Sequence, residues 1–309
     1  MTTPPNAMPQ SLESQPISPP SLSRARLFYW SVRRELWEYR AIYLAPLIAA
    51  AVALFGFLIS LVGLPHKMRS LAALDLAHQR DLVTQPFHFV AALIMGAAFL
   101  VSIFYSLDTL YGERRDRSIL FWKSLPVSDL TTVLAKTSIP LLVLPVLAFV
   151  ITLLIEAILL FLSSAVLLTN GLSVATLWTL LEPFDSMFAL LYHLVTVHML
   201  WYAPFYAWFL LISAWARRAP FLWAVLPGFA IVIFEKIAFH SSYFLDFLQG
   251  RLGGGREAVG NMQGNNVLDP GMQYTPGQFL ISPGLWLGLA VAVAFLFAAA
   301  RLRRYRGPI

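Results

Sequence analysis

Six long apolar stretches divide the chain, and they constrain its fold more than any other feature of the sequence. Each is close to the ~20 residues that an α-helix needs to cross the ~30 Å hydrocarbon core of a bilayer. We therefore predict an all-α polytopic membrane protein with six transmembrane helices. The predicted spans are Ala41–Leu64, Phe87–Asp108, Ile139–Leu168, Met187–Ala216, Phe221–Phe239 and Ile281–Ala300.

The composition agrees with a membrane protein. Hydrophobic residues make up 58% of the 309 residues and charged residues only 12%, whereas soluble domains carry about 25% charged residues. The chain contains no cysteine, which excludes disulfides, thiolate metal sites and cysteine nucleophiles. The first apolar stretch begins only at Ala41, after a polar and basic lead, so we expect the first span to be retained and not cleaved as a signal peptide.

Lysine and arginine are distributed unevenly between the two alternating sets of loops. The set that includes both termini carries 16 of the 22 Lys and Arg residues. Cytoplasmic loops are rich in these residues, so both termini are predicted to be cytoplasmic, with the protein in the plasma (inner) membrane. Because the basic residues are shared among several loops and do not form one stripe, no binding of nucleic acid is expected.

Three regions are predicted from composition and pattern. Residues 1–22 are rich in Pro, Ser and Gln and are predicted to be a disordered cytoplasmic tail. Residues 23–40 are predicted to form an amphipathic interfacial helix, and residues 41–309 are predicted to form the six-span transmembrane domain. The six-span domain includes a cytoplasmic loop at 111–129 and a large external loop at 240–280, in which a short helix is expected near Tyr243–Leu248.

The segment 23–40 predicts an amphipathic helix. Phe28, Val32, Leu36 and Tyr39 fall on one face of such a helix, and Arg33 lies on another. Aromatic residues close to a span favour a position at the membrane surface, in contact with lipid headgroups. The alternative is a solvated basic helix.

The densest polar segment between two spans is the loop 111–129. A short helix is predicted from about Asp116 and should stop near Leu125, because Pro126 disfavours helical geometry in the residue before it. Ser128 is suited to cap the next helix. An isolated helix of this length is marginal in water, so we expect it to dock onto a partner.

This loop resembles the one between the second and third spans of ATP-binding-cassette (ABC) type 2 permeases. The family pattern is an acidic residue, Gly-Thr, a leucine-rich turn, Leu-Pro-(Val/Ile)-Ser and, further on, Gly-Lys. The residues that carry the resemblance are Glu113, Arg117-Ser118, Ile119-Leu120, Leu125-Pro126-Val127-Ser128 and Ala135-Lys136. Arg117 and Ala135 depart from the glycines of the pattern. The layout of the family, with an interfacial helix before the first span, is similar over Ser23 to Arg306.

The resemblance implies a permease subunit of an ABC exporter, which itself is not an enzyme. It implies that the loop is a coupling helix seated on a separate ABC ATPase subunit, which binds ATP and Mg, and that two permease copies form a homodimer. The implied cargo is hydrophobic or amphipathic: a drug, a peptide or a lipid-like molecule. The implied coupling residues are Glu113, Arg114, Arg115, Arg117, Ser118, Ile119, Leu120, Trp122, Lys123, Leu125 and Pro126.

The chain lacks a phosphate-binding loop of the GxxxxGK[ST] kind, because no lysine follows a glycine. ATP hydrolysis is therefore expected on another subunit, with no cofactor in this chain. Without the resemblance, the same segment also fits an ordinary basic loop on the cytoplasmic side.

Polar residues inside the spans are costly in a bilayer and are candidates for function. Glu156, His193, His198 and Tyr202 are the candidate substrate-path residues. His193 and His198 are five residues apart and should not share one face of an α-helix, and no HExxH motif is present, so no metal site is expected. Two alternatives stay open: an intramembrane enzyme that uses Glu156 with either histidine, and a secondary transporter, for which the sequence has no matching pair of halves.

Overall fold

The computed structural model describes residues 23–71, 75–125, 127–253 and 276–309. Within these ranges every regular element is helical, and six helical segments are long and apolar enough to cross a membrane. The predicted all-α polytopic membrane fold is therefore confirmed. The predicted tail at 1–22, Pro126 and residues 254–275 of the predicted external loop lie outside the described residues.

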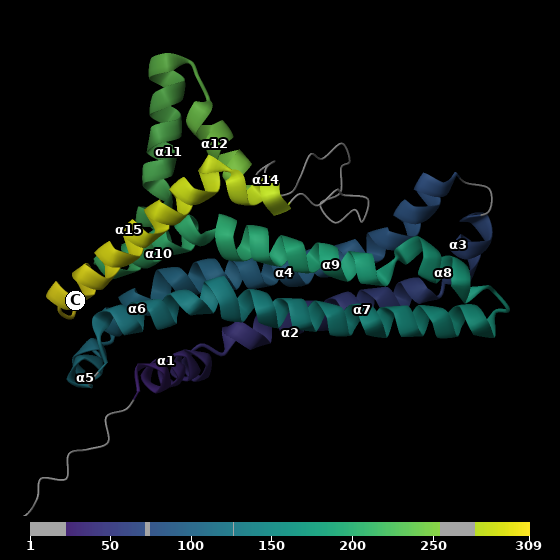
Figure 1. Cartoon of the computed structure of the whole chain (residues 1–309), viewed down its shortest axis with the longest axis horizontal. Helices are drawn as coiled ribbons and strands as arrows, with labels where there is room; N and C mark the ends of the chain where they lie inside the picture. The colour runs from purple at the N-terminus through teal and green to yellow at the C-terminus, as the bar shows by residue number, and fades with distance from the viewer. Residues whose placement is uncertain (1–22, 72–74, 126, 254–275) are drawn as a thin grey trace, which may run out of the picture.

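The first helix, α1 (Arg24–Glu38), lies at the end of the molecule where the C-terminal helix also ends (Figure 1). The side chain of Ser23 caps it by accepting a hydrogen bond from a backbone amide of the first turn. Val32, Leu36 and Tyr39 pack against the main hydrophobic core. The predicted amphipathic helix is present, and its apolar face packs on the protein.

The first three spans surround the main core. They are α2 (Ala41–Leu61), α4 (Leu76–Arg115) and a segment formed by α6 (Asp129–Ser138), the π-helical turn η1 (Ile139–Val143) and α7 (Leu144–Thr169). The second and third spans are longer than predicted, because each helix continues through polar residues at its ends. Two short helices join the spans, α3 (Leu64–Leu71) and α5 (Ile119–Ser124).

The fourth predicted span is divided in the structure. An apolar segment already begins with α8 (Val174–Leu181) and continues through α9 (Pro183–His193) and the π-helical η2 (Leu194–Trp201), and α10 (Ala203–Trp215) follows as a shorter apolar helix. Glu182 separates α8 from α9 because its φ of 44° lies in the left-handed region. The prediction of a single helix over Met187–Ala216 was therefore too simple.

The fifth span, α11 (Pro220–Phe239), projects from the rest of the bundle with α12 alongside it (Figure 1), and Ala224 is its only buried residue. It is followed by α12 (Tyr243–Leu252), which confirms the predicted short helix, and by α14 (Pro276–Ile281). The last span, α15 (Pro283–Tyr305), packs along α10 and reaches α6. α15 ends at the same end of the bundle as α1 (Figure 1).

Candidate functional site

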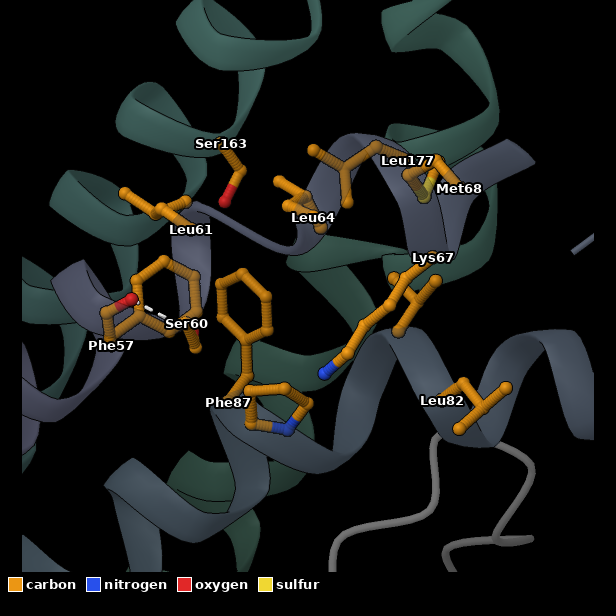
Figure 2. Close-up of a pocket in the computed structure, with 12 residues that line it drawn as sticks. Phe57, Ser60, Leu61, Leu64, Lys67, Met68, Leu82, Phe87, Ser163 and Leu177 are labelled. Atoms are coloured by element: carbon orange, nitrogen blue, oxygen red, sulfur yellow. Dashed lines mark hydrogen bonds between the residues drawn. The ribbon is translucent and has the colours of Figure 1, made fainter. Parts of the chain in front are cut away.

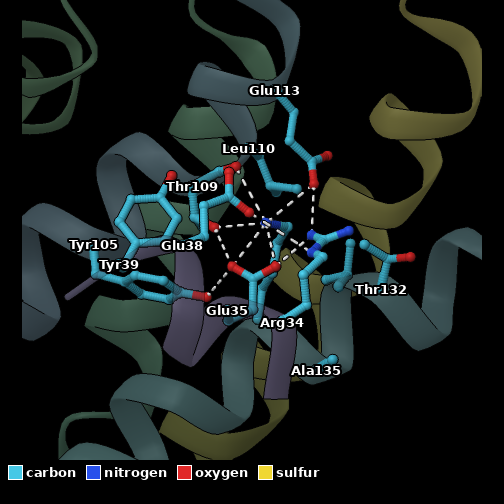
Figure 3. Close-up of polar contacts among 12 residues, drawn as sticks. Arg34, Glu35, Glu38, Tyr39, Tyr105, Thr109, Leu110, Glu113, Thr132 and Ala135 are labelled. Carbon is cyan, nitrogen blue, oxygen red and sulfur yellow. Dashed lines mark hydrogen bonds and ion pairs between the residues drawn. The ribbon is translucent and has the colours of Figure 1, made fainter. Parts of the chain in front are cut away.

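Five charged side chains meet where α1, α4, α6 and α15 converge, and Figure 3 shows Arg34, Glu35 and Glu113 among them. We call this set the charge cluster. Its members are Arg34, Glu35, Glu113, Lys136 and Arg303. Four of them are almost completely buried, with exposed fractions of 1% for Glu35 and Lys136 and 3% for Glu113 and Arg303. Charges so deeply buried are tolerated only when they are paired and hydrogen-bonded, so the cluster is a strong constraint on how these helices fit together.

The ammonium group of Lys136 lies at the centre of the charge cluster. Its Nζ donates to the two carboxylate oxygens of Glu35 at 2.9 and 3.1 Å and to Oγ1 of Thr109 at 2.7 Å. It also lies 3.2 Å from a carboxylate oxygen of Glu113. The hydroxyl of Tyr105 donates to Glu35 at 2.8 Å. One cation of α6 thereby holds together groups from α1 and α4.

Glu113 is the second centre of the charge cluster. Its carboxylate accepts hydrogen bonds from Arg303 at 3.1 Å and from Arg34 at 3.0 Å. Nε of Arg303 also lies 3.4 Å from a carboxylate oxygen of Asp129. The last span is therefore tied to the end of α4 and to the start of α6, so residues far apart in the sequence form one rigid junction.

The electrostatics of the charge cluster favour its charged form. Burial alone would raise the pKa of Glu35, but the charges of Lys136 and Arg34, with hydrogen bonds from Lys136 and Tyr105, lower that pKa from 4.5 to about 2. Burial likewise opposes the charge on Arg34, but Glu35 and Glu113 outweigh it and raise the pKa of Arg34. The carboxylate of Glu35 is therefore ionised at any physiological pH.

The lowered pKa of Glu35 predicts a specific loss of stability in acid. The ionised carboxylate stabilises the folded chain fully above its ordinary pKa of 4.5, and this contribution is lost as the pH falls from 4.5 towards 2. A shift of this size corresponds to about 3 kcal/mol of unfolding free energy. Unfolding of the detergent-solubilised chain should be measured from pH 7 to pH 3 for the wild type and for Glu35→Gln. The E35Q curve should be flatter over this range, and parallel curves would contradict the role given to Glu35.

Two of the predicted coupling residues, Glu113 and Arg114, lie in the interior. α4 continues to Arg115, so these residues belong to the end of a span and not to the short helix. Nη1 of Arg114 donates to the backbone carbonyls of Ala214 and Ala216 at 2.7 and 3.1 Å. Both residues are therefore buried within the chain, where they hold α4 in place.

The short helix α5 begins at Ile119, three residues later than predicted. Arg117 has a φ of 60°, a left-handed conformation that interrupts the helix and that glycine adopts most easily. This is one of the two positions where the chain departs from a glycine of the permease pattern. α5 ends at Ser124, and Leu125 is extended, as expected for a residue before proline. Ser128 caps α6 as predicted, by accepting from the amide of Thr131.

α5 has a buried face and an exposed apolar face. Ile119 is buried, and the ring of Trp122 lies 3.9 Å from the guanidinium carbon of Arg34, a member of the charge cluster. Leu120 and Phe121 project outward, with exposed fractions of 61% and 60%. The contacts of Ile119 and Trp122 therefore fix α5 to the bundle. Its other face presents two large apolar side chains, Leu120 and Phe121, beyond the last turn of α4.

The remaining predicted coupling residues lie around α5. Nζ of Lys123 donates to the backbone carbonyls of Arg304 and Arg306 at 3.3 and 3.2 Å, which links α5 to the end of α15. The hydroxyl of Ser118 donates to the carbonyl of Glu113 at 3.4 Å. Arg115 is exposed and pairs with Asp116. These contacts set the position of α5 relative to the spans.

Three of the candidate substrate-path residues come together in the structure. The ring centroids of His193 and His198 are 5.3 Å apart, and those of His198 and Tyr202 are 5.6 Å apart. The expectation that the two histidines would not share a face was wrong, because η2 is π-helical and its wider turn aligns residues five apart. The fourth candidate, Glu156, lines a separate cavity that neither histidine nor Tyr202 reaches.

No preformed metal site is present in the part of the chain that the structure describes. There, no group of three or more His, Asp or Glu side chains is placed to hold a metal ion.

The site residues predicted from the sequence did not include Arg34, Glu35, Lys136 and Arg303 of the charge cluster or Phe121 of the exposed face. A signal for Glu35 was present, because it lies three residues after Val32 and four before Tyr39, on the apolar face of α1. Lys136 was noted as part of the loop pattern, and Arg34 and Arg303 only in the count of basic residues. The partners of Lys136 and Arg303 lie far away in the sequence, so no local pattern indicates these ion pairs.

Comparison of the chain with protein-family models, with curated proteins and with solved structures gave no match. The functional argument therefore rests on the geometry of the site and on the loop pattern.

Proposed function

We propose that this chain is the permease subunit of an ATP-driven exporter and that α5 is its coupling helix. Two copies would act with separate ABC ATPase subunits, which bind ATP and Mg, in the inner membrane. The observation that carries the proposal is the exposed apolar pair Leu120 and Phe121 on a short helix between the ends of two long spans. Large apolar side chains at a loop tip are the kind of anchor that a partner's cleft buries.

The charge cluster supports a mechanical role for α5. Force on α5 would pass through Trp122 to Arg34 and through Ser118 to the backbone of Glu113. Arg34 is bound to the carboxylate of Glu113, which also pairs with Lys136 and Arg303. Because four helices are joined by these buried bonds, a displacement of α5 would tilt the spans together instead of bending a loop. Closure of a pair of ATPase subunits would then be converted into a rearrangement of the substrate path.

The charge distribution supports a cytoplasmic position for α5. α1, α5 and the end of α15 meet at one end of the molecule, as Figure 1 and the contacts of the charge cluster indicate. The loops at this end belong to the set that carries 16 of the 22 Lys and Arg residues. Both termini would therefore lie on the side where ATP is available.

The proposal predicts that an ATPase accompanies the chain and depends on α5. The tagged full-length chain, purified from its own host in mild detergent, should carry Mg-dependent ATP hydrolysis. Leu120→Asp should lower the co-purified activity to about one tenth or less, because it places a charge where an apolar anchor is buried. The measurement is phosphate release per mole of tagged chain.

A matched control is available on α4, the span that precedes α5. Leu76, the first residue of α4, is 73% exposed and lies at the opposite end of that helix from α5. Leu76→Asp should leave the co-purified activity unchanged. Equal activity in L76D and L120D preparations, or no ATPase activity with the wild type, would refute the proposal.

A further inference from the structure

A second feature of the structure lies among the apolar helices, away from the charge cluster. A cavity of about 280 Å³ opens between α4, α7, α8 and α9. Its walls are mostly apolar and include Phe87, Leu153, Leu160, Trp178 and Phe184. Its volume is close to the lower end of the ~300–1,000 Å³ typical of small-molecule sites, so it suits one small ligand and not a phospholipid with two chains.

One carboxyl group lies in this apolar wall. Glu156, in the middle of α7, forms no hydrogen bond and no ion pair with any residue that the structure describes. The other polar side chains of the lining are His88 and Ser186, and the Ser186 hydroxyl donates to the backbone carbonyl of Leu181 at 3.0 Å. A carboxyl group in hydrocarbon is costly unless it takes up a proton or meets a cation.

We propose that this cavity binds a small lipophilic cation, an amine joined to an apolar body. The ammonium group would pair with Glu156, and the apolar body would contact Phe87, Trp178 and Phe184, whose ring faces also attract cations. The inference rests on the proposed function only in treating this ligand as cargo. The binding itself needs neither ATP nor a partner subunit.

A smaller cavity next to this one provides a control. Phe87 lines both cavities, and the smaller one, of about 50 Å³, has room for only a few water molecules. Figure 2 shows Lys67 pointing into it, near Phe87. Lys67 does not line the larger cavity, so Lys67→Gln changes a nearby charge without altering the proposed site.

The test compares two ligands of nearly equal shape, 4-phenylbutylamine and the neutral 4-phenylbutanol. Isothermal titration calorimetry should be carried out on the full chain in lipid nanodiscs without an ATPase, with empty nanodiscs subtracted. The wild type should bind the amine at least about ten-fold more tightly than the alcohol. Glu156→Gln should bind the amine only as tightly as the alcohol, and K67Q should keep the wild-type preference.

Three outcomes would overturn the inference. They are equal affinity of the wild type for both ligands, binding of neither ligand, and an amine preference that survives in E156Q. The first two outcomes are measured on the wild type alone, so the inference can be tested even if E156Q does not fold. Because no ATPase is present in the calorimetry, a negative result here leaves the proposed function standing. Amine binding here, together with no ATPase activity co-purifying with the wild-type chain, would refute only the exporter proposal.

Discussion

Replacing Lys136 with methionine is expected to lower the free energy of unfolding by about 3–5 kcal/mol, the cost of removing one partner from a buried ion pair. The substitution keeps an unbranched side chain only one atom shorter but leaves the carboxylate of Glu35 without the cation that lies 2.9 Å away. Sodium dodecyl sulfate titration of the chain in mixed micelles, followed by circular dichroism, would measure the change.

The buried pair can be separated from other effects by a double-mutant cycle. If Glu35 and Lys136 act as a pair, the E35Q/K136M double variant should be more stable than the sum of the two single losses indicates, because no uncompensated charge is left. Lys67→Met removes an exposed lysine and should cost less than about 1 kcal/mol. Strict additivity of E35Q and K136M would show that the two side chains do not interact as the structure has them.

Replacing Glu113 with glutamine is expected to have an effect at least as large. The carboxylate of Glu113 lies within 3.2 Å of groups on Arg34, Lys136 and Arg303. Glu113→Gln removes the central negative charge and leaves three cations close together, so we expect a loss of about 3–5 kcal/mol. The loss should be accompanied by faster proteolysis at α1 and at the end of α15, since both are tied to α4 through this side chain.

A neighbouring acidic residue offers the control for this experiment. Asp108 is on the same helix and is partly exposed, with Arg115 3.9 Å away and a hydrogen bond of 3.3 Å from Tyr39. Asp108→Asn should cost less than about 1 kcal/mol. A similar loss in D108N and E113Q would mean that negative charge at this end of α4 matters in general and that the charge cluster has no special role.

Features encoded locally were predictable from the sequence. Hydropathy identified the spans, because burial in lipid depends on each segment's own composition. The face of α1 that carries Val32 and Leu36 followed from helical periodicity, and the cap at Ser128 from its side-chain chemistry. The loop pattern also predicted the position of α5. Its start was predicted too early, because an arginine at position 117 does not indicate a positive φ.

Features that depend on distant contacts were not predictable. Glu35 and Lys136 are 101 residues apart, and Glu113 and Arg303 are 190 residues apart. In each case the sequence alone shows a charged residue near the end of an apolar or amphipathic helix, which normally faces water or headgroups. The proximity of His193 and His198 was missed for a different reason, since the rule applied was that of an α-helix and the chain there is π-helical.

The most direct test of the central claim uses the natural absence of cysteine. Phe121→Cys places a single thiol on the exposed face of α5, and Asn170→Cys places one at the far end of α7. In vesicles with the cytoplasmic face outward and peripheral proteins removed, a membrane-impermeant maleimide should label F121C and not N170C. Restoring the ATPase subunit should protect F121C from labelling. Labelling of N170C in place of F121C, or equal labelling of F121C with and without the ATPase, would contradict the account of α5 as a cytoplasmic coupling helix.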